Sequence, residues 1–171
     1  MKNIVVAGHI DHGKTTLISA LSNVFKSKRI NYSENPMQIS RTETKITFSG
    51  ESYLFFDYPG DTDYKNNLNG SEDAAILVIA ATDGPMPGTK KAIQLCKELG
   101  IKKIIVFLNH CDMVDDEELV DLIEYDSIDL LEEYGFSNCH FIRGSAYYGG
   151  MCSEKWIKPI RNLVEIIAKE I

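Results

Sequence analysis

A glycine-rich loop joins a short apolar run to an amphipathic segment near the start of this chain. The apolar run covers residues 4–7, and the loop after it reads Gly8-His-Ile-Asp-His-Gly-Lys-Thr15. This string fits the phosphate-loop pattern G-x-x-x-x-G-K-[ST]. In that pattern the glycines let backbone N–H groups surround phosphate oxygens, the lysine reaches the β and γ phosphates, and the hydroxyl binds Mg²⁺. Because such a loop connects a strand to a helix, it favours an α/β fold with a phosphate-bearing ligand.

Apolar runs alternate with amphipathic segments along the rest of the chain. Continuous runs, typical of strands buried on both faces, cover residues 4–7, 53–56, 75–80, 103–108 and 140–142. Helical spacing follows the loop and recurs over 92–99, 117–134 and 156–167. One antiparallel hairpin is expected, from a strand at 45–48 through a turn at 49–51. The pattern predicts a three-layer α/β fold with a mostly parallel sheet.

Composition excludes several classes of function. The length of 171 residues and 44% apolar content suit one globular domain. Acidic residues outnumber basic ones by 25 to 18, and the net charge of −7 argues against DNA or anionic membranes as partners. The longest apolar run, 74–81, is far shorter than the roughly 20 residues that span a bilayer. Four cysteines without metal-ligand spacing favour a reduced, cytoplasmic protein.

Polar motifs follow three of the expected strands. They would lie at the carboxyl ends of those strands, which is where parallel sheets bind ligands. After residues 53–56 comes Asp57-Tyr-Pro-Gly60. Asp57 is placed to hold Mg²⁺ through water, and Gly60 can offer its N–H to a γ-phosphate without steric cost. This spacing extends the predicted phosphate site.

The other two motifs indicate recognition of guanine. Asn109-His-Cys-Asp112 follows residues 103–108, and Gly144-Ser-Ala146 follows 140–142. The Asp112 carboxylate can accept hydrogen bonds from N1–H and the exocyclic amine of guanine, a donor pair that adenine lacks. Backbone N–H groups of Ser145 and Ala146 can read the guanine O6. The order of the motifs at successive strand ends carries this interpretation.

These strings resemble the GTP-binding domain of elongation factor Tu, a translational GTPase of the P-loop class. The closest strings are residues 8–16, 80–87, 105–109 and 111–119, and the likeness runs from about residue 3 to the last helix. The resemblance implies a Ras-like fold with a six-stranded sheet, GTP and GDP as ligands, Mg²⁺, and nucleotide-dependent switch loops. It also implies hydrolysis of GTP by water and a role in protein biosynthesis.

The resemblance also implies the site residues. It assigns nucleotide binding to Gly8, His9, Ile10, Asp11, His12, Gly13, Lys14, Thr15, Thr16, Asp57, Gly60, Asn109, His110, Asp112, Ser145 and Ala146. It assigns Mg²⁺ to Thr15, Thr44 and Asp57, with Thr42 and Thr47 as rivals to Thr44. Lys14 and Gly60 are the expected catalytic groups on the phosphates.

Three positions depart from the family pattern. Asp61 stands where the family has its catalytic histidine, and His110 replaces the lysine of N-K-x-D. Residues 41–45 replace the switch I sequence R-G-I-T-I, and they bring in the charged Glu43. Because Asp61 brings negative charge towards an anionic phosphate, we expect slow hydrolysis.

Two alternatives remain, a nucleotide-binding regulatory module that does not hydrolyse GTP and a P-loop kinase for a small molecule. Asp112 at its strand end and the lack of a lid-like arginine cluster argue against the kinase.

We expect one GTP-binding domain over residues 1–171, without the β-barrel domains of the family. The expected partners are GTP, GDP and the ribosome or other translation machinery, with the chain itself a monomer. Aminoacyl-tRNA is not expected to bind this chain alone, since the family holds it jointly with the two barrels.

Overall fold

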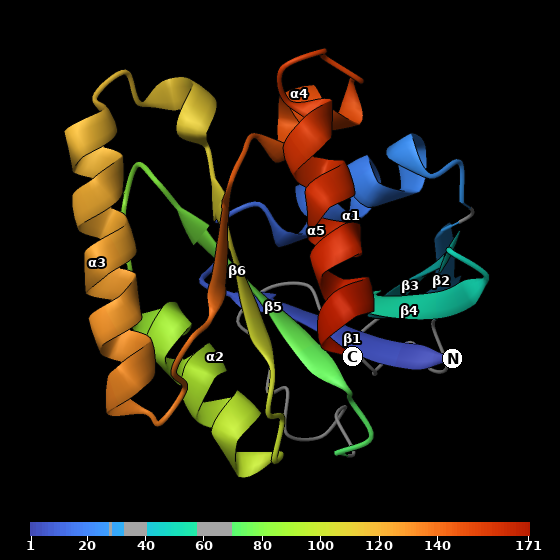
Figure 1. Ribbon diagram of the computed structural model, residues 1–171, viewed down its shortest axis with the longest axis horizontal. Coiled ribbons are helices and arrows are strands. Elements are labelled where there is room, and N and C mark those ends of the chain that lie inside the picture. The colour runs from blue at the N-terminus through green and yellow to red at the C-terminus, as the bar shows by residue number, and fades with distance from the viewer. Residues whose placement is uncertain (28, 33–40, 58–69) are drawn as a thin grey trace.

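A seven-stranded sheet runs through the centre of the computed structural model, which describes residues 1–27, 29–32, 41–57 and 70–171 (Figure 1). The strands are β1 (Lys2–Gly8), β2 (Arg29–Tyr32), β3 (Arg41–Phe48), β4 (Glu51–Asp57), β5 (Ala74–Ala80), β6 (Ile104–Asn109) and β7 (His140–Arg143). Their order across the sheet is β2-β3-β4-β1-β5-β6-β7. The pairs from β4 to β7 are parallel, whereas β2 with β3 and β3 with β4 are antiparallel.

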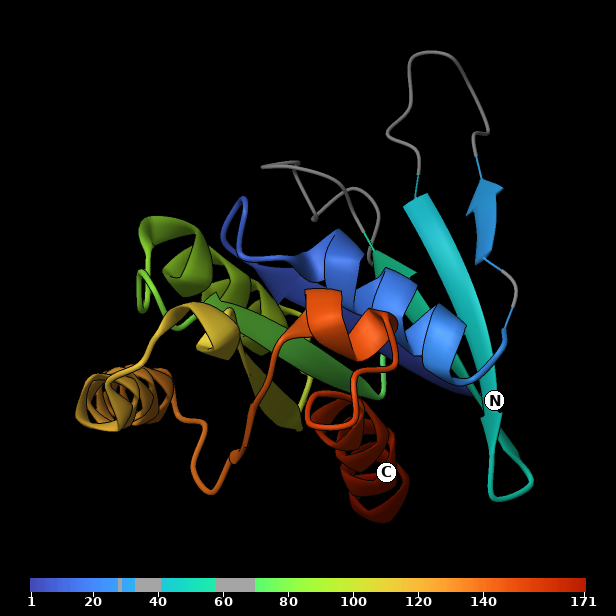
Figure 2. The ribbon, with the colours of Figure 1, turned by 90° about the horizontal axis from the view of Figure 1, so that it is seen from above.

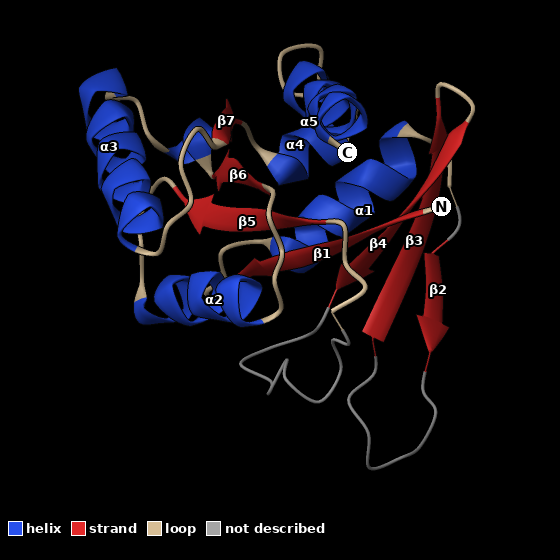
Figure 3. Ribbon diagram, turned by 60° about the horizontal axis from the view of Figure 1, so that its bottom comes forward, coloured by secondary structure: helices blue, strands red, loops and turns tan. Residues whose placement is uncertain are grey.

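Helices cover both faces of the sheet, as Figures 2 and 3 show. The helices are α1 (Lys14–Val24), α2 (Pro87–Glu98), α3 (Glu117–Glu133), α4 (Ala146–Gly150) and α5 (Ile157–Glu170), with a 3₁₀ turn at Cys111–Met113. Apolar side chains of α1 and α5 pack on one face, and those of α2 and α3 pack on the other. None of the helices in the described part of the chain is long and apolar enough to cross a membrane.

Burial on both faces explains the continuous apolar runs. Every residue of β5 is buried, and Val5 and Val6 of β1 face opposite clusters of the core. A parallel strand in this position needs apolar side chains on both sides. The predicted three-layer α/β fold with a mostly parallel sheet is therefore confirmed.

The antiparallel edge of the sheet differs in detail from the expectation. The hairpin is confirmed, and its turn holds Ser49 and Gly50 at φ values of 51° and 85°. However, β3 begins at Arg41, so residues 41–44 belong to a strand, and β2 makes the sheet seven-stranded instead of six-stranded. The short pattern Arg-Ile-Asn-Tyr of β2 has too few apolar residues to predict a strand.

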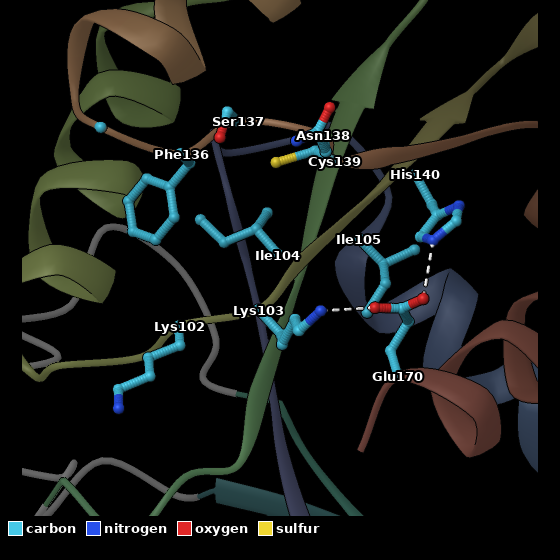
Figure 4. A pocket seen from close by; sticks show the side chains of 11 residues that line it. Lys102, Lys103, Ile104, Ile105, Phe136, Ser137, Asn138, Cys139, His140 and Glu170 are labelled. Atoms are coloured by element: carbon cyan, nitrogen blue, oxygen red, sulfur yellow. Dashed lines mark hydrogen bonds and ion pairs between the residues drawn. The ribbon is translucent and has the colours of Figure 1, made fainter.

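The end of α5 is held at the amino ends of β6 and β7, whereas the polar motifs lie at the carboxyl ends of the strands. Glu170 accepts a hydrogen bond from Nζ of Lys103 at 2.6 Å and lies 3.0 Å from Nε2 of His140 (Figure 4). A pocket of about 250 Å³ lies beside this cluster. The ion pairs fix the last turn of α5 against the starts of β6 and β7.

Candidate functional site

The phosphate loop follows β1 and turns sharply before α1. Gly8, Asp11 and Gly13 have positive φ values of 145°, 61° and 93°. A Cβ at Gly8 would lie 2.4 Å from the carbonyl oxygen of Val78, so the loop passes β5 too closely for any side chain there. The two predicted glycines therefore permit the close approach of the loop to β5 and the positive φ values of its backbone, as the motif requires.

Lys14 reaches back over this loop from the first turn of α1. Its Nζ donates to the carbonyl oxygens of Gly8 at 3.1 Å and His9 at 2.8 Å, and the side chain is buried. Thr15 and Thr16 follow on the exposed side of the turn. An ammonium group and a helix N-terminus thus lie at the same loop, which suits an anionic ligand.

The two loop histidines hold the loop to neighbouring elements. Nδ1 of His9 accepts the N–H of Gly88 in α2 at 3.1 Å, and Nδ1 of His12 accepts the N–H of Ala80 at 3.2 Å. The two rings meet edge to face, with centroids 5.1 Å apart. The motif leaves these two positions open, so its spacing gives no signal for these contacts. Ile10 between them is 44% exposed.

Asn109 joins the phosphate loop to the predicted base pocket. Its Nδ2 donates to the carbonyl of His12 at 2.9 Å, and its Oδ1 accepts the N–H of Ala146, also at 2.9 Å. Asn109 is buried at the end of β6. One side chain therefore sets the positions of two loops that come from distant parts of the sequence.

The loops after β6 and β7 lie against each other. Cys111 N–H donates to the carbonyl of Gly144 at 3.1 Å, and His110 has a left-handed φ of 62°. Ser145 is buried, and its Oγ accepts the N–H of Tyr148 at the start of α4. The structure thus brings the two predicted base-reading motifs together.

Asp112 lies in the 3₁₀ turn beside a pocket of about 490 Å³. The other walls of this pocket include Arg143 and Trp156. Burial raises the pKa of the Cys111 thiol, which keeps that side chain protonated and a poor nucleophile. Asp112 shares the lining of this pocket with Asp115 and Glu117, and it directly follows Cys111, whose N–H donates a hydrogen bond to the loop after β7.

The predicted metal ligands lie at different depths in the sheet. Asp57 is 2% exposed at the end of β4, next to β1, and its partner in β3 is Thr42. Thr44 pairs with Phe55 and is fully buried, and its hydroxyl has no hydrogen-bond partner among the described residues. Thr47 lies exposed near the hairpin turn. The strand register thus brings Thr42, and neither of the other two threonines, level with Asp57.

Two predicted residues, Gly60 and Asp61, lie outside the described residues.

The whole chain, residues 1–171, matches the family described as Elongation factor Tu GTP binding domain. The chain belongs to this family. It is therefore a GTP-binding domain of the translational GTPase type, and the family predicted from its motifs is confirmed. Members of this family are GTPases that bind GTP and GDP, which agrees with the phosphate loop and with the pairing of the two base-reading motifs.

Substitution of Gly13 tests whether the hydrogen bonds of Asn109 matter for nucleotide binding in this GTP-binding domain. A Cβ at position 13 would lie 2.1 Å from Nδ2 of Asn109, so Gly13→Ala must displace that side chain. We expect GDP to bind about 30-fold more weakly by calorimetry, because two buried hydrogen bonds are disturbed. Gly50→Ala is the matched control, since Gly50 has a similar φ and open space around it. An equal loss of GDP affinity in both variants would contradict a role for the Asn109 hydrogen bonds in nucleotide binding.

The buried ring of His12 predicts sensitivity to acid. Burial lowers the pKa of His12 from 6.5 to about 4; the neighbouring charge of His9 adds to this effect and Asp83 opposes it. The unfolded chain takes up the proton more readily, so the stability from His12 is complete above pH 6.5 and is lost as the pH falls towards 4. We expect a loss on the order of 2 kcal/mol in the free energy of unfolding. Urea unfolding at several pH values measures it, and His12→Asn must show a smaller pH dependence.

Proposed function

We propose that this GTP-binding domain is a Mg²⁺-dependent, cytoplasmic module of a translational GTPase that hydrolyses GTP slowly. The observation that carries the proposal is Asn109, which holds the phosphate loop and the Ala146 loop in one fixed arrangement. A ligand with a base at one end and phosphates at the other matches this arrangement. The ribosome or another part of the translation machinery is the partner that we propose.

The proposed contacts follow from the chemistry of each group. Lys14 and the loop N–H groups of residues 9–14 hold the phosphates, and Asp112, with the backbone at Ser145 and Ala146, holds guanine. His110 lies over the base, where an imidazole covers less of the ring than a lysine stem would. Contacts to the base therefore give the specificity for guanine, and contacts to the phosphates balance most of the negative charge of the nucleotide.

The oxygen donors around the loop fit Mg²⁺. Thr15 offers an exposed hydroxyl at the first turn of α1, and Asp57 offers a carboxylate at the end of β4. Hard oxygen ligands are those that Mg²⁺ prefers, and it usually keeps several waters. When bound, the ion neutralises charge that develops between the β and γ phosphates. Among the threonines of β3, the register favours Thr42 over Thr44 as the further ligand.

The proposed reaction is attack of water on the γ-phosphorus. The water oxygen forms a bond to phosphorus, the bond to the β–γ bridging oxygen breaks, and GDP and phosphate leave. The protein contributes position and positive charge, chiefly from Lys14 and the loop N–H groups. Gly60 offers its N–H to the γ-phosphate. Asp61, at the position of the family's histidine, accepts a hydrogen bond from water but donates none while ionised.

A regulatory module that does not hydrolyse GTP is the second candidate. Glu43 favours it, because this buried carboxylate lies in β3 opposite Phe56, where an apolar residue would help exclude bulk water. Single-turnover hydrolysis of radiolabelled GTP, with and without ribosomes, separates the two candidates. We expect slow phosphate release that Lys14→Ala abolishes. Release no faster than in that variant under both conditions would favour the regulatory module.

A further inference from the structure

The imidazole of His12 lies where β1 stops and β5 continues. In the register of the two strands, Gly8 at the end of β1 is level with Val78, whereas β5 runs on to Ala80. Ala81 donates its N–H to the carbonyl of Asn109 in β6 at 2.7 Å. Because N–H groups alternate in direction along a strand, the N–H of Ala80 points to the side where β1 has ended.

The His12 ring fills this place in the hydrogen-bond pattern. Its Nδ1 accepts the N–H of Ala80 at 3.2 Å, and the residue is fully buried. A buried N–H group that loses its acceptor is costly, so the ring and the end of β5 stabilise each other. The imidazole thus supplies the hydrogen-bond acceptor that a further residue of β1 would otherwise offer to β5.

The same residue sets the curvature of the phosphate loop. It lies between Asp11 and Gly13, which both have left-handed backbone, and its own carbonyl accepts the hydrogen bond from Asn109. The loop is therefore held at His12 both through the ring and through the backbone. We expect a shift of the ring to move the backbone of the adjacent residues, whose N–H groups the proposed function assigns to the phosphates.

Asp83 favours the tautomer that this arrangement needs. Since Nδ1 accepts a hydrogen bond, the neutral ring carries its proton on Nε2. Nε2 lies 3.5 Å from Oδ2 of Asp83, and among the described residues it has no hydrogen-bond partner. Asp83 is held in the turn after β5, where its N–H donates to the carbonyl of Ala80 at 3.1 Å. Its negative charge attracts the proton to Nε2 and leaves Nδ1 free to accept.

We propose that His12 is a positioning residue for phosphate binding and that Asp83 selects its tautomer. The inference rests on the proposed binding of guanine nucleotides. It assigns a role to a position that the loop motif leaves open, and the role is exerted through the backbone of the loop. A group that acts through the loop changes the contacts to the phosphates directly, whereas it reaches the base pocket only indirectly, through Asn109, so the affinity for the phosphates changes more than the affinity for the base.

Paired variants and paired ligands test this role. His12→Leu keeps much of the volume but removes the acceptor, whereas the Oδ1 of His12→Asn can stand in for Nδ1. By calorimetry we expect His12→Leu to bind GDP about tenfold or more weakly than the unmodified protein, and His12→Asn to recover to within about threefold. Binding of guanosine, which carries no phosphate and is followed by NMR titration, is expected to change by less than about twofold in both variants.

Asp83 is tested by substitution and by spectroscopy. Asp83→Asn changes an exposed residue, so we expect an intact fold and a loss of GDP affinity of about threefold. Glu165→Gln, the same change of charge on the exposed side of α5, is expected to leave the affinity unchanged. In ¹⁵N spectra of the unmodified protein, His12 is expected to show a protonated Nε2 and an unprotonated Nδ1.

The outcomes separate this inference from the proposed function. GDP affinity that is unchanged in His12→Leu, in a protein that prefers GDP to ADP, overturns the positioning role alone. Parallel losses for GDP and guanosine also overturn it, because they show a general effect on the fold. A protonated Nδ1 in the spectra overturns it even where His12→Leu does not fold. Lack of any preference for GDP in the unmodified protein overturns the proposed function instead.

Discussion

Replacing Asp61 with histidine is expected to raise the single-turnover rate of GTP hydrolysis by about 100-fold or more. In the family, a histidine at this position orients the attacking water and stabilises charge near the γ-phosphate. An aspartate brings a negative charge instead. Two unit charges about 4 Å apart interact by roughly 4 kcal/mol at an effective dielectric constant near 20, so we expect a carboxylate at this position to slow the reaction.

Asp61→Ala separates the two effects of the substitution. It removes the repulsion without adding an imidazole, so its rate is expected to fall between those of the unmodified protein and Asp61→His. Each protein is measured with and without ribosomes, because a partner can supply a catalytic group. If ribosomes stimulate the unmodified protein as strongly as Asp61→His, hydrolysis proceeds with another water-positioning group and the slow-hydrolysis proposal is wrong.

GDP is expected to bind at least about 100-fold more tightly than ADP. In the proposed complex the Asp112 carboxylate pairs with two donors on guanine, and adenine would leave this acceptor without a partner. Calorimetric titration with both nucleotides in the presence of Mg²⁺ gives the ratio. Equal affinities would contradict the assignment of the loops after β6 and β7 to guanine.

Asp112→Asn provides a sharper form of the same measurement. The amide can donate a hydrogen bond where the carboxylate could only accept, and xanthine carries a carbonyl oxygen in place of the guanine amine. We therefore expect the variant to lose affinity for GDP and to gain affinity for xanthosine diphosphate. A variant that loses affinity for both nucleotides by the same factor would place Asp112 outside the base contacts.

The sequence predicts those parts of this fold that depend on local pattern. The buried strands appear as apolar runs because both faces are covered, and the phosphate loop is recognisable because its fixed glycines have steric reasons, such as the approach of Gly8 to Val78. The order of motifs at strand ends also predicts that the loops of Asn109 and Ala146 form one pocket, and the structure brings these loops together. These features depend on spacing along the chain, which the sequence shows directly.

Other features depend on tertiary contacts that spacing does not reveal. Strand β2 exists because it pairs with β3, and α4 is only five residues long, too short for a helical period to appear. The threonine register in β3 depends on where the hairpin turns. The hydrogen bonds of His9 and His12 go to residues far along the chain, so two positions that the motif treats as free hold the loop in place.

The pocket beside Asp112 gives this domain an intrinsic optical probe. Trp156 is the single tryptophan of the chain, and it lines that pocket together with Asp112. Nζ of Lys155 lies 4.5 Å from the centre of its ring, so the indole is sensitive to local charge. Emission from this one residue can therefore follow arrival and departure of the nucleotide in real time, without a dye attached to either molecule.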